Sequence, residues 1–278
     1  MSLPQGAGPI GVFDSGYGGL TILRELRALM PQYDYLYLGD NARAPYGTRS
    51  FDVVYRYTRQ AVATLFDRGC HLVILACNTA SAKALRTIQQ NDLPQLDPNR
   101  RVLGVIRPTA EIVGSITKSR HVGILATTGT ILSRSYDMEI QKLHPDIIVT
   151  GQDCPMWVPL VENFEFDSPG ADYFVKKRIN MLLQRDAEID TIILACTHYP
   201  LLMSKIRQYT PQGINIISQG HYVAQSLSAY LNHHTDMAQR LTANGTLHCL
   251  TTENTDKFCA TAVRFLGHEI QADNIVLS

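Results

Sequence analysis

The chain has 278 residues, enough for one large domain or two of ordinary size, each with a substantial core. Its 25 basic and 25 acidic residues cancel to a formal net charge of zero, so it lacks the basic excess of a general nucleic-acid binder. No apolar run approaches the length of a membrane span, and the first residues, MSLPQGAG, lack the features of a secretion signal. We expect a soluble, cytoplasmic protein that binds a small molecule and neither nucleic acid nor membranes.

The cysteine content favours free thiols. An even number of cysteines can form a disulfide framework, but such frameworks belong mainly to small secreted domains. The sequence has no CxxC or HExxH motif, and its histidines do not cluster at the spacing of zinc ligands, so we expect no structural metal. The six cysteines are Cys70, Cys77, Cys154, Cys196, Cys249 and Cys259.

Short apolar segments alternate with helical patterns along the first part of the chain. The run PIGVF at 9–13 predicts a strand, and apolar residues three and four apart predict a helix at 20–30 that Pro31 ends. A second strand is expected at 33–39. The next helix, at 50–69, has Ser50 as its N-cap and Gly69 as its terminator. Its apolar stripe consists of Val54, Tyr57, Ala61 and Leu65.

A third strand at 71–77, a helix at 79–90 and a fourth strand at 100–106 continue the alternation. Strands joined through helices run parallel, and strands that are apolar at nearly every position are typical of sheets buried on both faces. The sequence therefore predicts an α/β fold with a parallel sheet flanked by helices.

The second part of the chain repeats this order. HVGILAT at 121–127 corresponds to PIGVFDS, DIIVTG at 146–151 to DYLYLG, and INIIS at 214–218 to RVLGV. The segment LVILAC ends at Cys77, and TIILAC ends at Cys196. Such self-similarity predicts two pseudo-duplicated α/β domains, with a coincidence of apolar runs as the alternative.

A tail without a counterpart in the second unit follows. It contains a predicted helix at 221–231, a polar loop around 232–245, a strand at 246–252 and a helix at 255–267. We expect this tail to pack on the first unit and make it discontinuous. The predicted domains are therefore 1–108 with 219–278, and 109–218.

Both repeated cysteines lie where a strand ends and a helix begins. Parallel sheets bind ligands at this edge, and the unpaired N–H groups of a helix N-terminus favour a thiolate. Cys77 and Cys196 are therefore candidate bases, and Pro200 suits the first turn of the second helix. The alternatives are inert buried cysteines, a metal site with His198, and a redox disulfide between the two thiols.

Two further turns belong to the same edge. Asp14 and Ser15 follow the first strand in the Gly-rich segment FDSGYGGL, where a carboxylate would repel a phosphate but suits a substrate ammonium. Tyr46 and Gly47 follow the second strand, where a hydroxyl and a backbone N–H could hold a carboxylate, with a solvent-exposed turn as the alternative. No lysine takes an equivalent position for a Schiff base. These groups suit proton transfer at carbon on a small zwitterionic substrate.

Five segments together carry a family resemblance: GVFDSGYGGLTILREL, LGDNARAPYG, ILACNTASA, CPMWVPLVE and ILACTHYPLL. They resemble the cofactor-independent glutamate racemases of the bacterial aspartate/glutamate racemase family, and the resemblance covers 10–267. It implies that two domains face each other across a cleft that holds the active site, with glutamate between one cysteine of each. It also implies no cofactor, a homodimer, and D-glutamate as a product for peptidoglycan synthesis.

The same resemblance implies a role for individual residues. Cys77 is the base towards D-glutamate, and Cys196 is the base towards L-glutamate. Asp14 beside the first thiol and His198 beside the second assist proton handling, with Glu162 in a supporting role. The residues implied to hold the substrate carboxylates and ammonium are Asp14, Ser15, Tyr46, Gly47, Asn78, Thr79, Thr127, Thr130, Thr197 and His198.

Two segments differ from the family pattern. VIRPTAE carries Arg107 and Thr109 where smaller or acidic residues are common, and IISQGHYVA lacks the acidic residue often found after that strand. The nearest alternative function is a racemase of aspartate or a hydantoin from the same superfamily. An alternative of another class is a non-catalytic amino-acid-binding protein, although a binder does not need two equivalent thiols.

Overall fold

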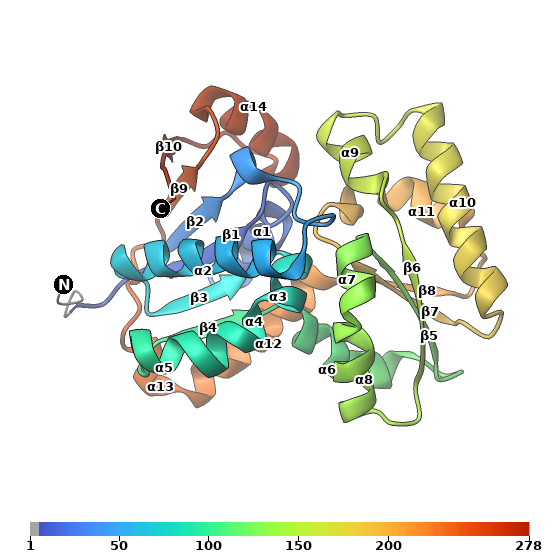
Figure 1. Cartoon of the computed structure of the whole chain (residues 1–278), viewed down its shortest axis with the longest axis horizontal. Helices are drawn as coiled ribbons and strands as arrows, with labels where there is room; N and C mark the ends of the chain where they lie inside the picture. The colour runs from blue at the N-terminus through green and yellow to red at the C-terminus, as the bar shows by residue number, and fades with distance from the viewer. Residues whose placement is uncertain (1–5, 278) are drawn as a thin grey trace.

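Two parallel sheets lie side by side in the computed structural model, which describes residues 6–277 (Figure 1). The first has six strands in the order β10-β9-β2-β1-β3-β4, and the second has four in the order β6-β5-β7-β8. Within residues 6–277, no helix combines the length and apolar character needed to span a membrane.

The strands of each sheet come from separate parts of the chain. The first sheet contains β1 (Ile10–Asp14), β2 (Tyr35–Gly39), β3 (Leu72–Leu75), β4 (Arg101–Gly104), β9 (Leu247–Thr251) and β10 (Ala272–Asn274). The second sheet contains β5 (His121–Ala126), β6 (Ile148–Asp153), β7 (Thr191–Ala195) and β8 (Asn215–Ser218).

Helices connect these strands and cover both faces of each sheet. The α-helices are α1 (Leu20–Leu29), α2 (Phe51–Asp67), α3 (Asn78–Lys83), α4 (Leu85–Thr87), α5 (Leu93–Leu96), α6 (Ile106–Ile116), α7 (Thr128–Ser133), α8 (Ser135–Leu143), α9 (Trp157–Glu162), α10 (Pro169–Arg185), α11 (Met203–Tyr209), α12 (Gln219–His233), α13 (Thr235–Ala238) and α14 (Thr255–Leu266). Shorter helical turns are η1 (Asn41–Arg43), the π-helical η2 (Ile88–Asp92) and η3 (Tyr199–Leu202).

The two sheets share one strand order. β2-β1-β3-β4 in the first sheet corresponds to β6-β5-β7-β8 in the second, and the pairs match the sequence segments that repeat. The predicted pair of duplicated α/β units is therefore confirmed. Cys77 follows β3 and Cys196 follows β7, so the two thiols occupy corresponding places in the two sheets.

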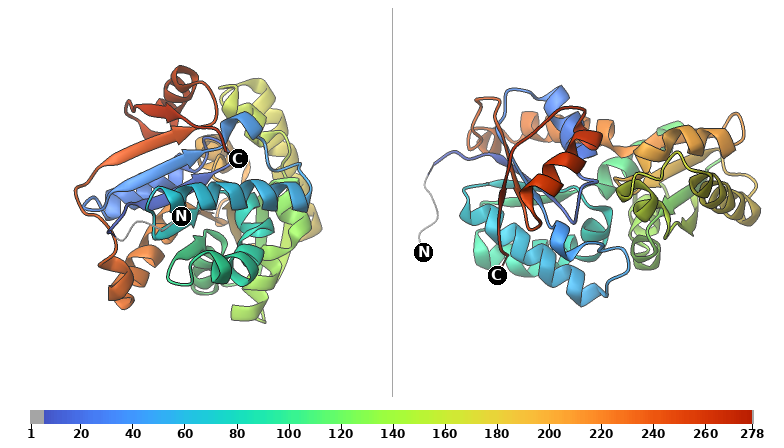
Figure 2. Two further views of the ribbon diagram at one scale, coloured as in Figure 1. Left: turned by 60° about the vertical axis from the view of Figure 1, so that its left-hand side comes forward. Right: turned by 90° about the horizontal axis from the view of Figure 1, so that it is seen from above.

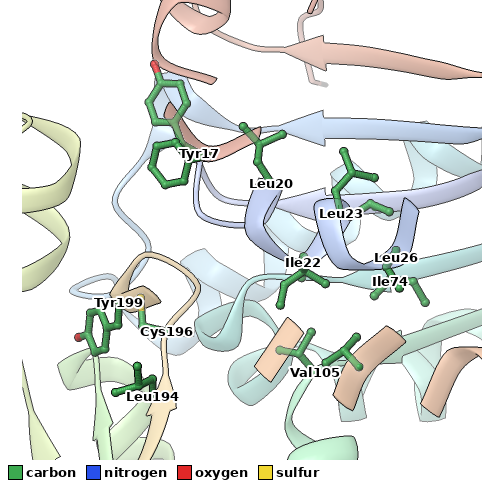
Figure 3. Packing of buried hydrophobic residues seen from close by; sticks show 14 of the residues in the cluster. Tyr17, Leu20, Ile22, Leu23, Leu26, Ile74, Val105, Leu194, Cys196 and Tyr199 are labelled. Atoms are coloured by element: carbon green, nitrogen blue, oxygen red, sulfur yellow. The ribbon is translucent and has the colours of Figure 1, made fainter. Parts of the chain in front are cut away.

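Side chains of the first sheet alternate between two apolar clusters because successive residues of a strand point to opposite faces. Leu72 and Ile74 of β3 face α1, α12 and α14, whereas Val73 and Leu75 face α2 and α3. Figure 3 shows Ile74 close to the side chains of α1. The first of these clusters also includes residues of the second sheet, so one apolar core connects the two sheets.

The second sheet is buried in the same way. Ile192 and Leu194 of β7 pack with α10, whereas Ile193 and Ala195 pack with α6 and α8. Figure 1 shows α8 and α10 on opposite sides of this sheet. The continuous apolar runs in the sequence are explained by this burial on both faces.

The tail joins the first sheet. β9 pairs with β2 along its length, from Leu247 opposite Tyr35 to Thr251 opposite Gly39. Figure 2 shows α14 in the lobe that contains this sheet, and α12 packs on α1. The domain boundaries after 108 and 218 stay a prediction.

Most expected elements are present within a few residues of their predicted ends. Ser50 caps α2 by accepting a hydrogen bond from the Val53 N–H at 3.4 Å, and Gly69 follows the helix with φ of 91°. The single helix expected at 79–90 is wrong, because this range is divided among α3, α4 and η2, with α5 following. Pro94 lies at the start of α5 and has no N–H to continue an α-helical ladder, which accounts for the irregular turn before it.

Two short elements of the tail were not expected. α13 forms inside the predicted polar loop, where the buried side chain of Met237 anchors a single turn. β10 adds an edge strand with the sequence ADN, which has none of the β-branched or aromatic residues that signal a strand.

Candidate functional site

Loops that follow strands of both sheets line one cavity of about 130 Å³. The loops after β1, β2 and β3 form one wall, and the loops after β5, β6 and β7 form the other. In each sheet the strand order reverses beside β1 or β5, which is where open α/β sheets bind ligands. The cavity therefore lies at the corresponding place of both sheets.

Most residues that the sequence singled out line this cavity. Asp14 and Thr130 are buried and are not among the lining residues. Those that line it are Ser15, Tyr46, Gly47, Cys77, Asn78, Thr79, Thr127, Glu162, Cys196, Thr197 and His198.

The first thiol caps a helix. Cys77 is the N-cap of α3, and its Sγ accepts a hydrogen bond from the Ala80 N–H at 3.4 Å. The Ser15 Oγ lies 3.3 Å from the same sulfur. Burial and the charge of Asp14 raise the pKa of Cys77 to about 12, although the two hydrogen bonds oppose this shift. In the absence of ligand this residue is therefore a thiol at neutral pH.

Asp14 lies at the end of β1, next to this thiol. Its Oδ2 accepts a hydrogen bond from the Gly16 N–H at 2.8 Å, and its Oδ1 has no partner within residues 6–277. Burial raises the pKa of Asp14, although the charge of His198 opposes this shift. Asp14 can contact a substrate ammonium only if the cavity extends to its Oδ1. This contact stays a prediction.

The second thiol has an imidazole and a carboxylate behind it. The Cys196 Sγ lies 3.9 Å from His198 Nδ1, and His198 Nε2 lies 3.0 Å from Glu162 Oε1. Burial lowers the pKa of His198, but its hydrogen bonds to Cys196 and Glu162 outweigh burial and raise this pKa to about 10. The imidazole is therefore a cation at neutral pH, 3.9 Å from the Cys196 sulfur.

Gly18 brings the first loop against this second thiol. A Cβ at Gly18 would lie 2.3 Å from Thr197 Oγ1 and 2.4 Å from His198 Nδ1, closer than real side chains approach. Only glycine fits at this position. The Gly-rich segment therefore allows the loop after β1 to lie directly against the loop after β7.

The loop after β2 presents backbone donors to the cavity. The Tyr46 hydroxyl donates to the Asp40 carboxylate, and a role of Tyr46 in holding a substrate carboxylate stays a prediction. The N–H groups of Tyr46 and Gly47 have no acceptor in the described part of the chain. A Cβ at Gly47 would lie 2.9 Å from the Thr127 Cβ, so glycine allows this loop to approach the second sheet.

Three threonines form a hydroxyl cluster between the sheets. The Thr79 Oγ1 lies 3.0 Å from the Thr127 Oγ1 and 3.4 Å from the Thr130 Oγ1, and the last two lie 3.1 Å apart. Thr79 and Thr127 line the cavity, whereas Thr130 lies behind them. The structure thus brings together three predicted site residues and gives Thr130 a supporting place.

The sequence reasoning missed one wall of the cavity. Cys154 and Val158 line it, together with two prolines of the segment CPMWVP. The segment CPMWVPLVE carries part of the family resemblance, but Glu162 is its only predicted site residue. The available signal was the position of Cys154 directly after β6, which corresponds to a strand end already judged important.

The thiols show no metal-site or disulfide arrangement. Within residues 6–277, no group of three or more His, Cys, Asp or Glu side chains is placed to hold a metal ion. Cys77 and Cys196 are both free thiols.

Comparison with known proteins identifies the family. Residues 20–227 match the family described as Asp/Glu/Hydantoin racemase. A glutamate racemase from a Ruegeria species is 38% identical over 271 residues, covering 94% of this chain and 97% of that protein. A solved glutamate racemase isoform from Bacillus anthracis has a TM-score of 0.88 and 35% identity, covering 97% of this chain and 98% of its own.

A second solved structure holds a ligand. The glutamate racemase of Francisella tularensis, in complex with D-glutamate, has a TM-score of 0.85 and 30% identity, with 98% of each chain covered. These similarities extend over nearly the whole chain and include both sheets. This chain belongs to the Asp/Glu/Hydantoin racemase family and is an amino-acid racemase, an isomerase.

Proposed function

We propose that this protein interconverts L- and D-glutamate in the cytoplasm by proton transfer between Cys77 and Cys196, and that it supplies D-glutamate for peptidoglycan synthesis. The observation that carries the proposal is that the two thiols follow corresponding strands of the two sheets and line one cavity. A planar carbanion is inverted only if a base removes the proton on one face and an acid delivers one on the other. Two strand ends on opposite walls supply these two groups.

The surroundings of the thiols support a direction for the resting enzyme. His198 is a cation beside Cys196, whereas Cys77 has a raised pKa and remains a thiol. In our proposal the Cys196 thiolate removes the α-proton of L-glutamate, and the Cys77 thiol protonates the opposite face. The products are D-glutamate, a Cys196 thiol and a Cys77 thiolate, so protons and charge balance. The reverse reaction begins from that second state.

Glutamate is favoured over aspartate by the relatives, which are named glutamate racemases, and by the D-glutamate in the Francisella structure. The cavity also offers donors for a carboxylate beyond the α-carbon. Gly47 lies against Thr127, and the N–H groups of Tyr46 and Gly47 have no acceptor in the described part of the chain. We assign the side-chain carboxylate of glutamate to these donors.

Circular dichroism of purified protein with D-glutamate, D-aspartate or L-alanine tests the substrate. We expect the signal to decay only with D-glutamate, without added metal or pyridoxal phosphate. Decay with D-aspartate alone would favour the aspartate alternative. No decay with any amino acid, together with thermal stabilisation by glutamate, would favour an amino-acid-binding protein.

Serine substitutions test the two-base scheme. Cys77→Ser and Cys196→Ser should each abolish turnover in both directions while glutamate still stabilises the folded protein against heat. Cys259→Ser is the matched control, since Cys259 is a free thiol of α14 that does not line the cavity. Full turnover by either of the first two variants would contradict the scheme. In deuterium oxide, product should gain solvent deuterium chiefly on conversion.

We also propose that the protein is a homodimer, as the family resemblance implies. Light scattering coupled to size-exclusion chromatography measures its mass directly. The expected mass is twice the 31.0 kDa of one chain, and a mass of one chain would contradict the proposal.

A further inference from the structure

A closed ring of hydrogen bonds joins three buried side chains beside the cavity. The Asn78 Nδ2 donates to Gln219 Oε1, the Gln219 Nε2 donates to the Tyr136 hydroxyl, and that hydroxyl donates to Asn78 Oδ1. Each of the three distances is 2.6 Å. Asn78 and Gln219 are each 3% exposed and Tyr136 is 2% exposed, so water does not compete for these groups.

The ring joins parts of the chain that are far apart in sequence. Asn78 begins α3 after the first sheet's β3, Tyr136 lies in α8 beside the second sheet, and Gln219 begins α12. Of these, only Asn78 lines the cavity. Gln219 and its neighbour Thr109 lie in the two segments that differ from the family pattern, and the two side chains meet here.

A backbone carbonyl fixes the orientation of Gln219. The terminal atom assigned as Nε2 lies 3.2 Å from the Val105 carbonyl oxygen and 3.1 Å from the Thr109 Oγ1. A carbonyl can only accept, and the Thr109 hydroxyl donates its own hydrogen to the same carbonyl at 3.2 Å. The atom of Gln219 at this place must therefore be the nitrogen.

The orientation then passes around the ring. Since Gln219 turns its oxygen toward Asn78, the facing atom of Asn78 must be the donor Nδ2, and its oxygen must face Tyr136. Burial raises the pKa of Tyr136, so its hydroxyl keeps the proton that it donates. One Nδ2 hydrogen of Asn78 is used in the ring, and the other has no acceptor in the described part of the chain.

We propose that Gln219 is a positioning residue for the racemase: acting through Asn78, it makes that side chain present an N–H, and not a carbonyl oxygen, to a substrate carboxylate. The proposal rests on the proposed function, because the ligand must carry a carboxylate at this wall. A reversed Asn78 would turn its oxygen toward an anion. The ring therefore contributes to substrate affinity through the electrostatics of one amide.

The test compares KM with kcat for glutamate in both directions. Gln219→Met keeps the size of the side chain and removes both the donor nitrogen and the acceptor oxygen of its amide. We expect KM to rise by about tenfold to a hundredfold, the effect of losing a hydrogen bond to a charged group. We expect kcat at saturation to change by a smaller factor than KM, because the contact to the carboxylate is already made in the substrate complex and strengthens only modestly as Cα loses its proton.

Thr109→Val is the matched control. It removes one buried hydroxyl next to Gln219 but leaves the Val105 carbonyl and the ring in place, so it should keep the wild-type KM even if the protein melts at a lower temperature. If Gln219→Met does not fold, Tyr136→Phe tests the same ring from the second sheet. It removes the donor that holds the Asn78 oxygen, and it should raise KM in the same direction.

A double-substitution cycle separates positioning from general damage. If Gln219 acts through Asn78, adding Gln219→Met to Asn78→Ala should leave KM at the value of Asn78→Ala alone. A multiplied effect in the double variant, or a wild-type KM in a folded Gln219→Met protein, would overturn the proposal. Wild-type turnover of glutamate in the same assay tests the proposed function separately, so either failure can be recognised.

Discussion

Removing the charge of Glu162 should shift the alkaline limit of activity to lower pH. Glu162→Gln keeps an oxygen that can accept from His198 Nε2, now 3.0 Å from Glu162 Oε1, but it removes the negative charge. That charge is one of the causes that raise the pKa of His198 to about 10. In the variant the imidazolium should lose its proton earlier as pH rises, and Cys196 then loses its neighbouring cation.

The size of the shift follows from the strength of the contact. Hydrogen bonds between charged groups contribute roughly 1.5–3 kcal/mol, and one unit of pKa corresponds to about 1.4 kcal/mol. Glu162 retains some solvent contact and its replacement can still accept a hydrogen bond, which places the effect in the lower part of this range. We expect the pKa of His198 to fall by about one to two units.

The assay is kcat/KM for glutamate as a function of pH. The alkaline limb of Glu162→Gln should move down by about one to two pH units, and the acid limb should stay in place. Glu165→Gln is the matched control, because Glu165 is exposed on the same segment and its side chain makes no hydrogen bond or ion pair within residues 6–277. If the alkaline limb of Glu162→Gln coincides with that of the wild type, the coupling between the carboxylate and the imidazole is refuted.

The same pair predicts how stability varies with pH. The pKa of His198 is raised in the folded protein from 6.5 to about 10, so its contribution to the free energy of unfolding is fully present below pH 6.5. That contribution is lost as pH rises through about 10. Urea denaturation should therefore show a smaller difference between wild type and Glu162→Gln at pH 10.5 than at pH 7.

Three other substitutions have defined outcomes. Gly18→Ala should fold but lose at least about a hundredfold in kcat/KM, since its Cβ would lie 2.3 Å from a side-chain oxygen of the site. Gly170→Ala is the control and should retain activity, because a Cβ there meets only a serine hydroxyl at 3.3 Å. Asp14→Asn should speed alkylation of Cys77 by iodoacetamide at pH 8, measured by mass spectrometry, because the Asp14 charge helps to raise the pKa of that thiol. Asp34→Ala should lower the free energy of unfolding by about 3 kcal/mol at pH 7, because Asp34 accepts four hydrogen bonds from the tail. The pKa of Asp34 is lowered in the folded protein because hydrogen bonds from Thr242, Thr246 and Asn244 outweigh burial, so the difference should shrink as pH falls below 3.8.

The sequence predicted the strands and the two thiols because their signals are local. A strand buried on both faces must be apolar at nearly every position, as Leu72–Leu75 and Thr191–Ala195 are, and such runs stand out in a single sequence. The repeated Ala-Cys pair needs only a comparison of the chain with itself. The place of the cavity then follows from a general property of parallel sheets.

The remaining features depend on contacts between distant residues. Gln219 contacts Asn78 across 141 positions and Tyr136 across 83, and no spacing pattern connects them. The hydrogen bond from the Tyr46 hydroxyl to Asp40 is likewise a tertiary contact. The irregular helix after Cys77 arose from packing and from Pro94, which outweighed a sequence that favours one continuous helix.

The unequal surroundings of the two thiols have a restricted effect on the kinetics. L- and D-glutamate are mirror images with equal free energies in water, so their equilibrium constant is unity and kcat/KM must be the same in both directions at every pH. The His198–Glu162 pair on one side and Asp14 with Ser15 on the other therefore cannot favour one direction in kcat/KM. They can change kcat and KM together, because in the proposed scheme each enantiomer binds to a different protonation state of the thiols. For a charge-removing variant such as Glu162→Gln, the ratio of kcat between the two directions and the ratio of KM between them should change by the same factor. The pH profiles of kcat/KM for the two directions should remain superimposed.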